Sequence, residues 1–94
     1  MLVAELDEVD YDLEVDGEQV RRTVHRKVFE RGAWATVAIV FEERGDDGWK
    51  PAKLALIRLQ KVREAWKKHA ALTLSAEDAR DLGGAIASWF SASG

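Results

Sequence analysis

The order of elements is decided by residues 69–90, which read HAALTLSAEDARDLGGAIASWF. The first six of these residues alternate around Leu72 and Leu74, which favours a strand with both leucines facing the core. Ser75 then stands at a typical helix N-cap, and the two acidic residues that follow at 77 and 78 complement the positive end of a helix dipole. Apolar residues recur behind them at helical spacing, at Ala79, Leu82, Ile86, Trp89 and Phe90. The stretch therefore predicts a strand that runs directly into a C-terminal amphipathic helix.

Three earlier segments have strand composition. Residues 19–29 alternate and carry many bases; residues 33–43 are β-branched and aromatic and apolar on both faces; residues 53–61 alternate around a face that becomes polar. The second of these segments is expected to be a central strand that is buried on both faces. The sequence thus predicts an α+β fold of order β-β-β-β-α, with a four-stranded curved antiparallel sheet, over residues 19–94.

Length and charge add two expectations. At 94 residues without cysteine, the chain is one domain with a thin core, and small domains of this kind often gain stability by dimerising. Residues 1–18 hold eight acids and no base, so all 14 bases lie with the other nine acids in a basic body. We expect residues 1–18 to form an acidic arm, either disordered or an edge strand, and favour a mobile arm. The absence of a basic leader or a long apolar run predicts a cytoplasmic protein, nucleoid-associated in a bacterium.

Catalytic and metal-binding patterns are missing from the sequence. The two histidines, His25 and His69, have no Cys, His or carboxylate at metal-ligand spacing, and no Ser or Thr has a convincing base partner. We therefore expect a binding protein rather than an enzyme, with no metal and no cofactor. The pair Gly83-Gly84 inside the predicted helix favours close helix packing, across a dimer axis.

Basic and aromatic residues recur near the predicted strands. Single-stranded nucleic-acid binders combine cations that contact phosphates with aromatic rings that stack on bases. Residues 61–68 are expected to be a basic loop that contains one of these aromatic residues. The alternative is a solvated sheet face on which Lys and Arg discourage edge pairing. The candidate nucleic-acid-binding residues are Arg21, His25, Lys27, Trp34, Arg58, Lys61, Trp66, Lys67 and Lys68.

Residues 20–90 resemble the positive-cofactor-four family of transcriptional coactivators and its small bacterial relatives, which are related to Whirly domains. The likeness is strongest from Pro51 to Phe90, where KLALIRL at 53–59 resembles the family's third strand and WKKHAALTLS at 66–75 resembles its basic turn and fourth strand. The family usually has Lys-Gly just before the fourth strand, whereas this chain has Ala70-Ala71.

The resemblance implies a homodimer that binds single-stranded DNA, or RNA, with little sequence preference, together with a partner from the transcription machinery. Arg58, Trp66, Lys67 and Lys68 would lie nearest the DNA, with Trp66 and Trp34 stacking on bases. The acidic arm would compete with nucleic acid for the basic face. The helix residues Leu82, Ile86, Trp89 and Phe90 would form the dimer interface, or else close the monomer core. A protein-interaction module on the same fold without nucleic-acid binding is the alternative function, which the net charge of −3 allows.

Overall fold

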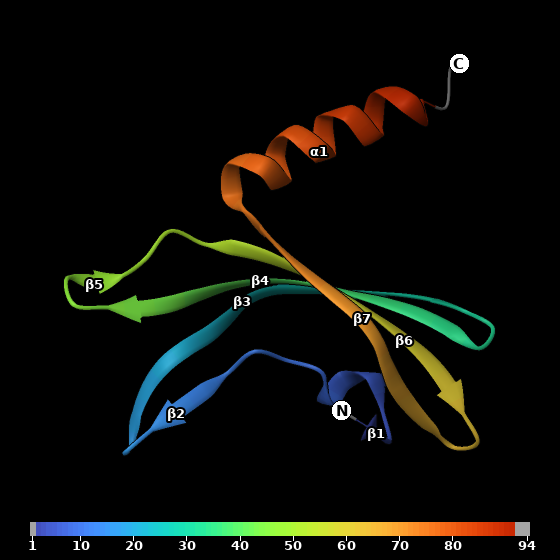
Figure 1. Cartoon of the computed structure of the whole chain (residues 1–94), viewed down its shortest axis with the longest axis horizontal. Coiled ribbons are helices and arrows are strands. Elements are labelled where there is room, and N and C mark those ends of the chain that lie inside the picture. The colour runs from blue at the N-terminus through green and yellow to red at the C-terminus, as the bar shows by residue number, and fades with distance from the viewer. Residues whose placement is uncertain (1, 92–94) are drawn as a thin grey trace.

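All strands in residues 2–91 join one curled antiparallel sheet, and the helix stands off one side of it (Figure 1). The computed structural model describes residues 2–91. The elements are β1 (Leu2–Val3), the 3-10 helix η1 (Leu6–Glu8), β2 (Leu13–Val15), β3 (Glu18–Arg31), β4 (Trp34–Gly45), β5 (Gly48–Trp49), β6 (Lys53–Val62), β7 (Ala65–Ser75) and α1 (Ala76–Trp89). The strand order is β1-β7-β6-β4-β3-β2, with β5 paired to β4.

The prediction of a four-stranded sheet was wrong, because the sheet has seven strands. The four long strands β3, β4, β6 and β7 do pair as antiparallel neighbours in chain order, and α1 follows the last of them. Two of the extra strands lie in residues 1–18, which were expected to form an arm or an edge strand, and the third, β5, lies at residues 48–49, where no strand was predicted. β1 pairs with β7, β2 pairs with β3, and β5 folds back on the end of β4.

The core lies on the inner, concave face of the sheet. Alternate residues of β4 are fully buried there, and the residues between them are half-buried on the outer face, so the central strand is not buried on both faces as expected. Strand β6 and the N-terminal segment supply the other side chains of this core. Its members are Leu6, Val9, Ala35, Val37, Ile39, Phe41, Ala55, Ile57, Leu59 and Trp66.

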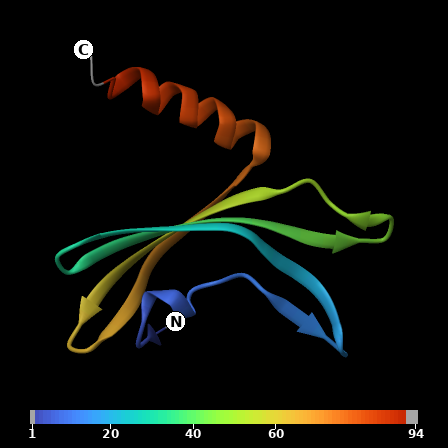
Figure 2. The same cartoon turned by 180° about the vertical axis from the view of Figure 1, so that it is seen from behind.

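The N-terminal segment lies against the inner face, opposite the helix (Figure 2). Leu6 and Val9 are buried in the core, and their backbone oxygens accept hydrogen bonds from Arg26, whose Nε lies 2.8 Å from the Val9 oxygen. The Nε of Arg21 likewise donates to the backbone oxygen of Tyr11 at 2.9 Å. The segment expected to be a mobile arm is therefore a folded part of the domain, with an edge strand at each end.

A bulge in β3 changes which residues share a face. The register against β4 shifts between Thr23 and His25, so the simple alternation expected over residues 19–29 is broken. Thr23, beside this bulge, donates its backbone N–H to Asp12 Oδ1 at 2.7 Å. As a result Arg21 and Arg26 lie on the inner face, while His25 and Lys27 lie on the outer face.

The expected loop at residues 61–68 is a tight turn instead. β6 ends at Val62 and β7 begins at Ala65, and Arg63 adopts a positive φ of 63° between them. Trp66 is therefore inside a strand, where it faces the core.

Helix α1 begins as predicted, because Ser75 Oγ accepts a hydrogen bond from the backbone N–H of Asp78 at 3.1 Å. Its main contacts with the sheet are with β6 and β7, and none of its described residues is buried. Leu72 and Leu74 pair with Leu56 and Leu54 on the outer face, and Leu72 is 52 % exposed, so the prediction that they face the core was wrong. Within residues 2–91, no helix has both the length and the apolar character needed to cross a membrane.

Candidate nucleic-acid interface

Cross-strand pairing places several basic and aromatic side chains on the outer face, because residues directly opposite in an antiparallel pair project to the same side. Arg31 pairs with Trp34, Trp34 pairs with Gln60, and Gln60 pairs with Lys67. Along β3, His25 and Lys27 pair with the outward Val40 and Ala38. We call this surface the outer strip and define it as His25, Lys27, Arg31, Trp34, Arg58, Lys67 and His69.

The centre of the outer strip is a contact chain around Trp34. The Arg58 guanidinium carbon lies 4.9 Å from the centroid of the indole ring, and Arg58 Nη1 donates to Thr36 Oγ1 at 3.0 Å. The His69 ring meets the indole edge-on, with 5.0 Å between centroids, and His69 Nε2 lies 2.8 Å from Gln60 Oε1. The half-buried Trp34 is thus fixed from two sides, with a planar cation and an imidazole exposed beside it.

Charge on the outer strip is almost wholly positive. The nearest outward acid on β4, Glu42, is paired with Arg22, with 2.8 Å between Nε and Oε1. Among residues 2–91, Lys27, Arg31, Arg58 and Lys67 form no ion pair. Four cations without a carboxylate partner lie therefore on one face and are free to contact an anionic ligand.

Four predicted site residues lie elsewhere. Trp66 is only 4 % exposed and belongs to the core, so its ring cannot stack on a base. Lys61 lies 5.7 Å from the Trp66 centroid on the inner side, and Arg21 is engaged with Tyr11. Lys68 pairs with the buried Leu59 and so also belongs to the inner side. His25, Lys27, Trp34, Arg58 and Lys67 are the predicted residues that the fold brings to one face.

Sequence reasoning missed Arg31 and His69 as site residues. Arg31 and Trp34 flank a two-residue turn with Gly32 at a φ of 56°, and such a short turn forces its flanking residues to pair. The turn at residues 32–33 could therefore have predicted from the sequence that Arg31 lies opposite Trp34. His69 sits where the register of β7 against β6 shifts, and nothing in the local sequence reveals that bulge.

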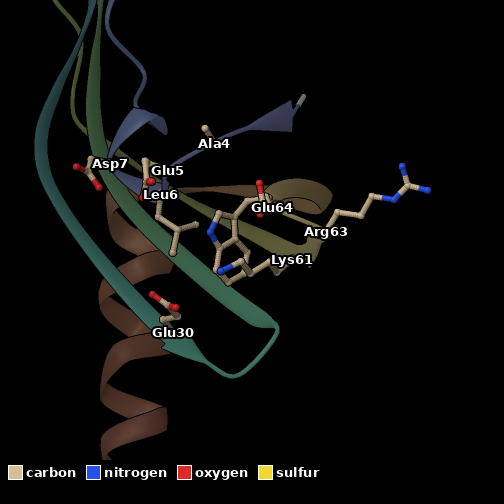
Figure 3. A pocket seen from close by; sticks show the side chains of 9 residues that line it. Ala4, Glu5, Leu6, Asp7, Glu30, Lys61, Arg63 and Glu64 are labelled. Carbon is tan, nitrogen blue, oxygen red and sulfur yellow. The ribbon is translucent and has the colours of Figure 1, made fainter.

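A hollow of about 520 Å³ opens on the inner side, between the N-terminal segment and the β6–β7 turn (Figure 3). Leu6 and Trp66 line it together with charged side chains of both signs, while Arg63 points away from it. Carboxylates outnumber cations there, with Glu5, Asp7, Glu30 and Glu64 against Lys61 and Arg63, so this hollow does not suit a polyanion. In the part of the chain that the structure describes, no three His, Asp or Glu side chains are grouped as a metal site.

No protein-family model matches the chain, and no curated protein or solved structure matches it either. The likeness to the positive-cofactor-four family therefore rests on the motifs quoted above and stays a prediction.

Proposed function

We propose that the chain binds single-stranded nucleic acid on the outer strip, as a non-sequence-specific DNA-binding protein of the transcriptional-cofactor type. The observation that supports this most is the cluster of Arg58, Trp34 and His69 on the outer strip, whose Lys and Arg side chains form no ion pair among residues 2–91. Unpaired bases stack on aromatic rings and on guanidinium planes, and each stack contributes about 1–3 kcal/mol. Stacking and phosphate contacts tolerate any base, which favours binding without sequence preference.

The net charge of −3 does not oppose this proposal, because the charges are segregated in space. The N-terminal segment, which carries eight of the acids, packs Leu6 and Val9 into the core on the inner side of the sheet (Figure 2). Short-range attraction to phosphate depends on the local surface, since salt screens charges more than about 8–10 Å apart at physiological ionic strength.

Fluorescence anisotropy of a labelled single-stranded DNA, titrated with the full chain at about 50 and 200 mM salt, tests the proposal. If four phosphates are neutralised, the logarithm of the binding constant falls with a slope of about −2.8 against log salt, or about 50-fold over this range. The same titration is repeated with RNA of the same sequence and with a DNA duplex. Preference for the single strand over the duplex is expected, and the RNA arm decides between the two nucleic acids.

Substitutions on the outer strip and on the inner side of the sheet show which surface binds the nucleic acid. Lys67→Gln and Trp34→Ala should each weaken binding about 5- to 50-fold, and Lys67→Gln should also reduce the salt slope by about 0.7. Lys61→Gln is the matched control, since Lys61 lies on the inner side, and should leave binding unchanged. Absence of salt-sensitive binding, or equal losses for Lys61→Gln and Lys67→Gln, would rule out the outer strip.

The second candidate is a protein-interaction module without nucleic-acid binding. The observation in its favour is the exposed apolar end of α1, where Trp89 and the C-cap residue Phe90 lie outside the core. Flat anisotropy for both nucleic acids at both salt concentrations would favour this candidate.

A further inference from the structure

The inner hollow beside the β6–β7 turn has no part in nucleic-acid binding on the outer strip. Its volume of about 520 Å³ lies within the range of about 300–1,000 Å³ that is typical of small-molecule sites. Its lining comes from three parts of the chain, namely the N-terminal segment, the end of β3 and the β6–β7 hairpin (Figure 3). Leu6 and Trp66 are its buried members, whereas its charged members are exposed. The hollow therefore combines an apolar floor with charged walls.

A second, smaller hollow on the outer face has a different lining. It measures about 150 Å³ and is mainly apolar, and a cavity of about that volume accommodates a benzene ring. Its lining residues are Thr36, Leu56, Arg58, Ala70, Ala71 and Leu72, of which only Arg58 is charged. Of these two hollows, the inner one alone offers charges of both signs to a ligand.

Trp66 supplies the inner hollow with a hydrogen-bond donor that no protein group uses. The residue is 4 % exposed, and its indole N–H has no hydrogen-bond partner among residues 2–91. None of the described side-chain nitrogens that lack a partner is fully buried, so this N–H keeps an accessible surface, and Trp66 lines the hollow. The N–H of a buried tryptophan usually finds a partner. An acceptor on a ligand in the hollow would provide it.

A second donor lies beside this indole. Lys61 pairs with Trp66 across β6 and β7, and its Nζ lies 5.7 Å from the centroid of the ring. Lys61 forms no ion pair in the part of the chain that the structure describes. An ammonium group and an N–H group on neighbouring strands can both donate to one carboxylate, and such charge-assisted hydrogen bonds are the strong ones. This side of the hollow is therefore suited to a ligand carboxylate.

Carboxylates line the other sides of the hollow. Glu30 lies on the inner face of β3, Glu5 and Asp7 belong to the N-terminal segment, and Glu64 stands in the β6–β7 turn. None of these four carboxylates forms an ion pair with another residue of 2–91, and Arg63 points away from the hollow (Figure 3). No three of them are grouped as a metal site within the described residues. The carboxylates therefore match an organic ligand with a cationic group better than a single metal ion.

The donors and the carboxylate of β3 are separated across the sheet. The strands β7, β6, β4 and β3 are consecutive neighbours, so Trp66 and Glu30 lie three strands apart. Neighbouring strands are about 4.7–4.9 Å apart, which places the two backbones about 14 Å from one another along the sheet. The inward side chains shorten this gap without closing it. A ligand with its opposite charges at the two ends of a flexible chain can reach both sides, whereas a compact zwitterion cannot.

We infer that the inner hollow binds a basic amino acid, either free or as the last residue of a short peptide. The carboxylate of the ligand accepts hydrogen bonds from Lys61 and from the indole N–H of Trp66. Its side-chain cation lies toward Glu30 and the other carboxylates, and its methylene groups pack on Leu6. The positive side chain complements the excess of carboxylates in the lining. This site lies on the opposite face of the sheet from the outer strip, so the inference does not depend on nucleic-acid binding.

Proton–nitrogen correlation NMR of the full chain, titrated with L-arginine, tests this inference. The chain has four tryptophans, and the indole signal of Trp66 is the one that disappears in Trp66→Phe. We expect this signal to shift saturably, with a dissociation constant of about 1 mM or below. Agmatine lacks the carboxylate of arginine and L-norvaline lacks its guanidinium, so each should bind at least about 10-fold more weakly. The dipeptide Gly-Arg decides between the two sources, because tighter binding than that of arginine indicates a peptide C-terminus.

Glu30→Gln and Lys61→Gln change opposite sides of the hollow, and each should weaken arginine binding at least about 10-fold. Both residues are exposed, so the core should stay intact in these variants. Glu14→Gln removes an exposed acid of β2 that does not line the hollow, and this control should bind arginine like the parent. The absence of a saturable shift of the Trp66 signal up to about 20 mM arginine would overturn the inference. Equal binding of arginine and norvaline, or equal losses for Glu14→Gln and Glu30→Gln, would also overturn it.

Discussion

Replacing Leu6 by alanine tests whether the acidic N-terminal segment is part of the core or an arm. Leu6 is 7 % exposed and contacts the cluster that includes Trp66. The lost methyl and methylene groups contribute about 0.8 kcal/mol each, and the residual cavity adds to this, so we expect a loss of about 3 kcal/mol. For a chain of this size, with a urea m-value of about 1 kcal/mol per M, the midpoint should fall by about 3 M.

The measurement is urea unfolding followed by tryptophan fluorescence at one fixed protein concentration. Leu13→Ala in the same segment is the matched control, since Leu13 is exposed, and should change stability by less than about 0.5 kcal/mol. If Leu6→Ala and Leu13→Ala gave equal midpoints, the placement of the segment in the core would be refuted.

The result also bears on the idea that this segment competes with nucleic acid. Deleting residues 1–18 would remove Leu6 and Val9 from the core, so a gain in DNA affinity after deletion has meaning only if the remaining sheet stays folded.

Three further outcomes follow from particular contacts. Arg26→Gln should lower the free energy of unfolding by about 1–2 kcal/mol in urea titrations, because it removes charged donors to the Leu6 and Val9 carbonyls, whereas Arg31→Gln should have no such effect. Ser75→Ala should cost helix α1 about 1 kcal/mol and reduce ellipticity at 222 nm without shifting the urea midpoint of the sheet; a shifted midpoint would show that helix and sheet unfold together. Gly84→Ala should favour the helix by about 1 kcal/mol yet weaken self-association, and stronger association in sedimentation runs would contradict close helix approach.

The parts of the fold that follow from local periodicity could be predicted from the sequence. The β-branched and aromatic composition of residues 33–43 and the alternation of residues 53–61 predicted β4 and β6, and the cap at Ser75 and the helix after it were placed correctly, because each depends on neighbours within a few positions. Most of the basic and aromatic residues of the outer strip could also be chosen as candidates from the sequence, because residue type and spacing along a strand are local properties.

The rest depends on contacts between distant residues. The bulge between Thr23 and His25 reverses the faces of every later residue of β3, and Thr23 beside it is bonded to Asp12, eleven positions away. Charge density suggested that residues 1–18 are mobile, yet Leu6 and Val9 are buried in the core and the segment's backbone oxygens accept hydrogen bonds from Arg21 and Arg26. Trp66 was assigned to a loop because Arg63 takes a positive φ without the glycine that usually marks such a turn.

Arg58 belongs at once to the outer strip and to the wall of the small apolar hollow on the outer face. If both surfaces bind a ligand, this shared guanidinium couples the two binding events, and such coupling is reciprocal. A ligand in the hollow that holds Arg58 in its place over Trp34 would tighten binding at the strip, and binding at the strip would tighten the ligand in the hollow by the same factor. A ligand that displaces Arg58 would make each event oppose the other.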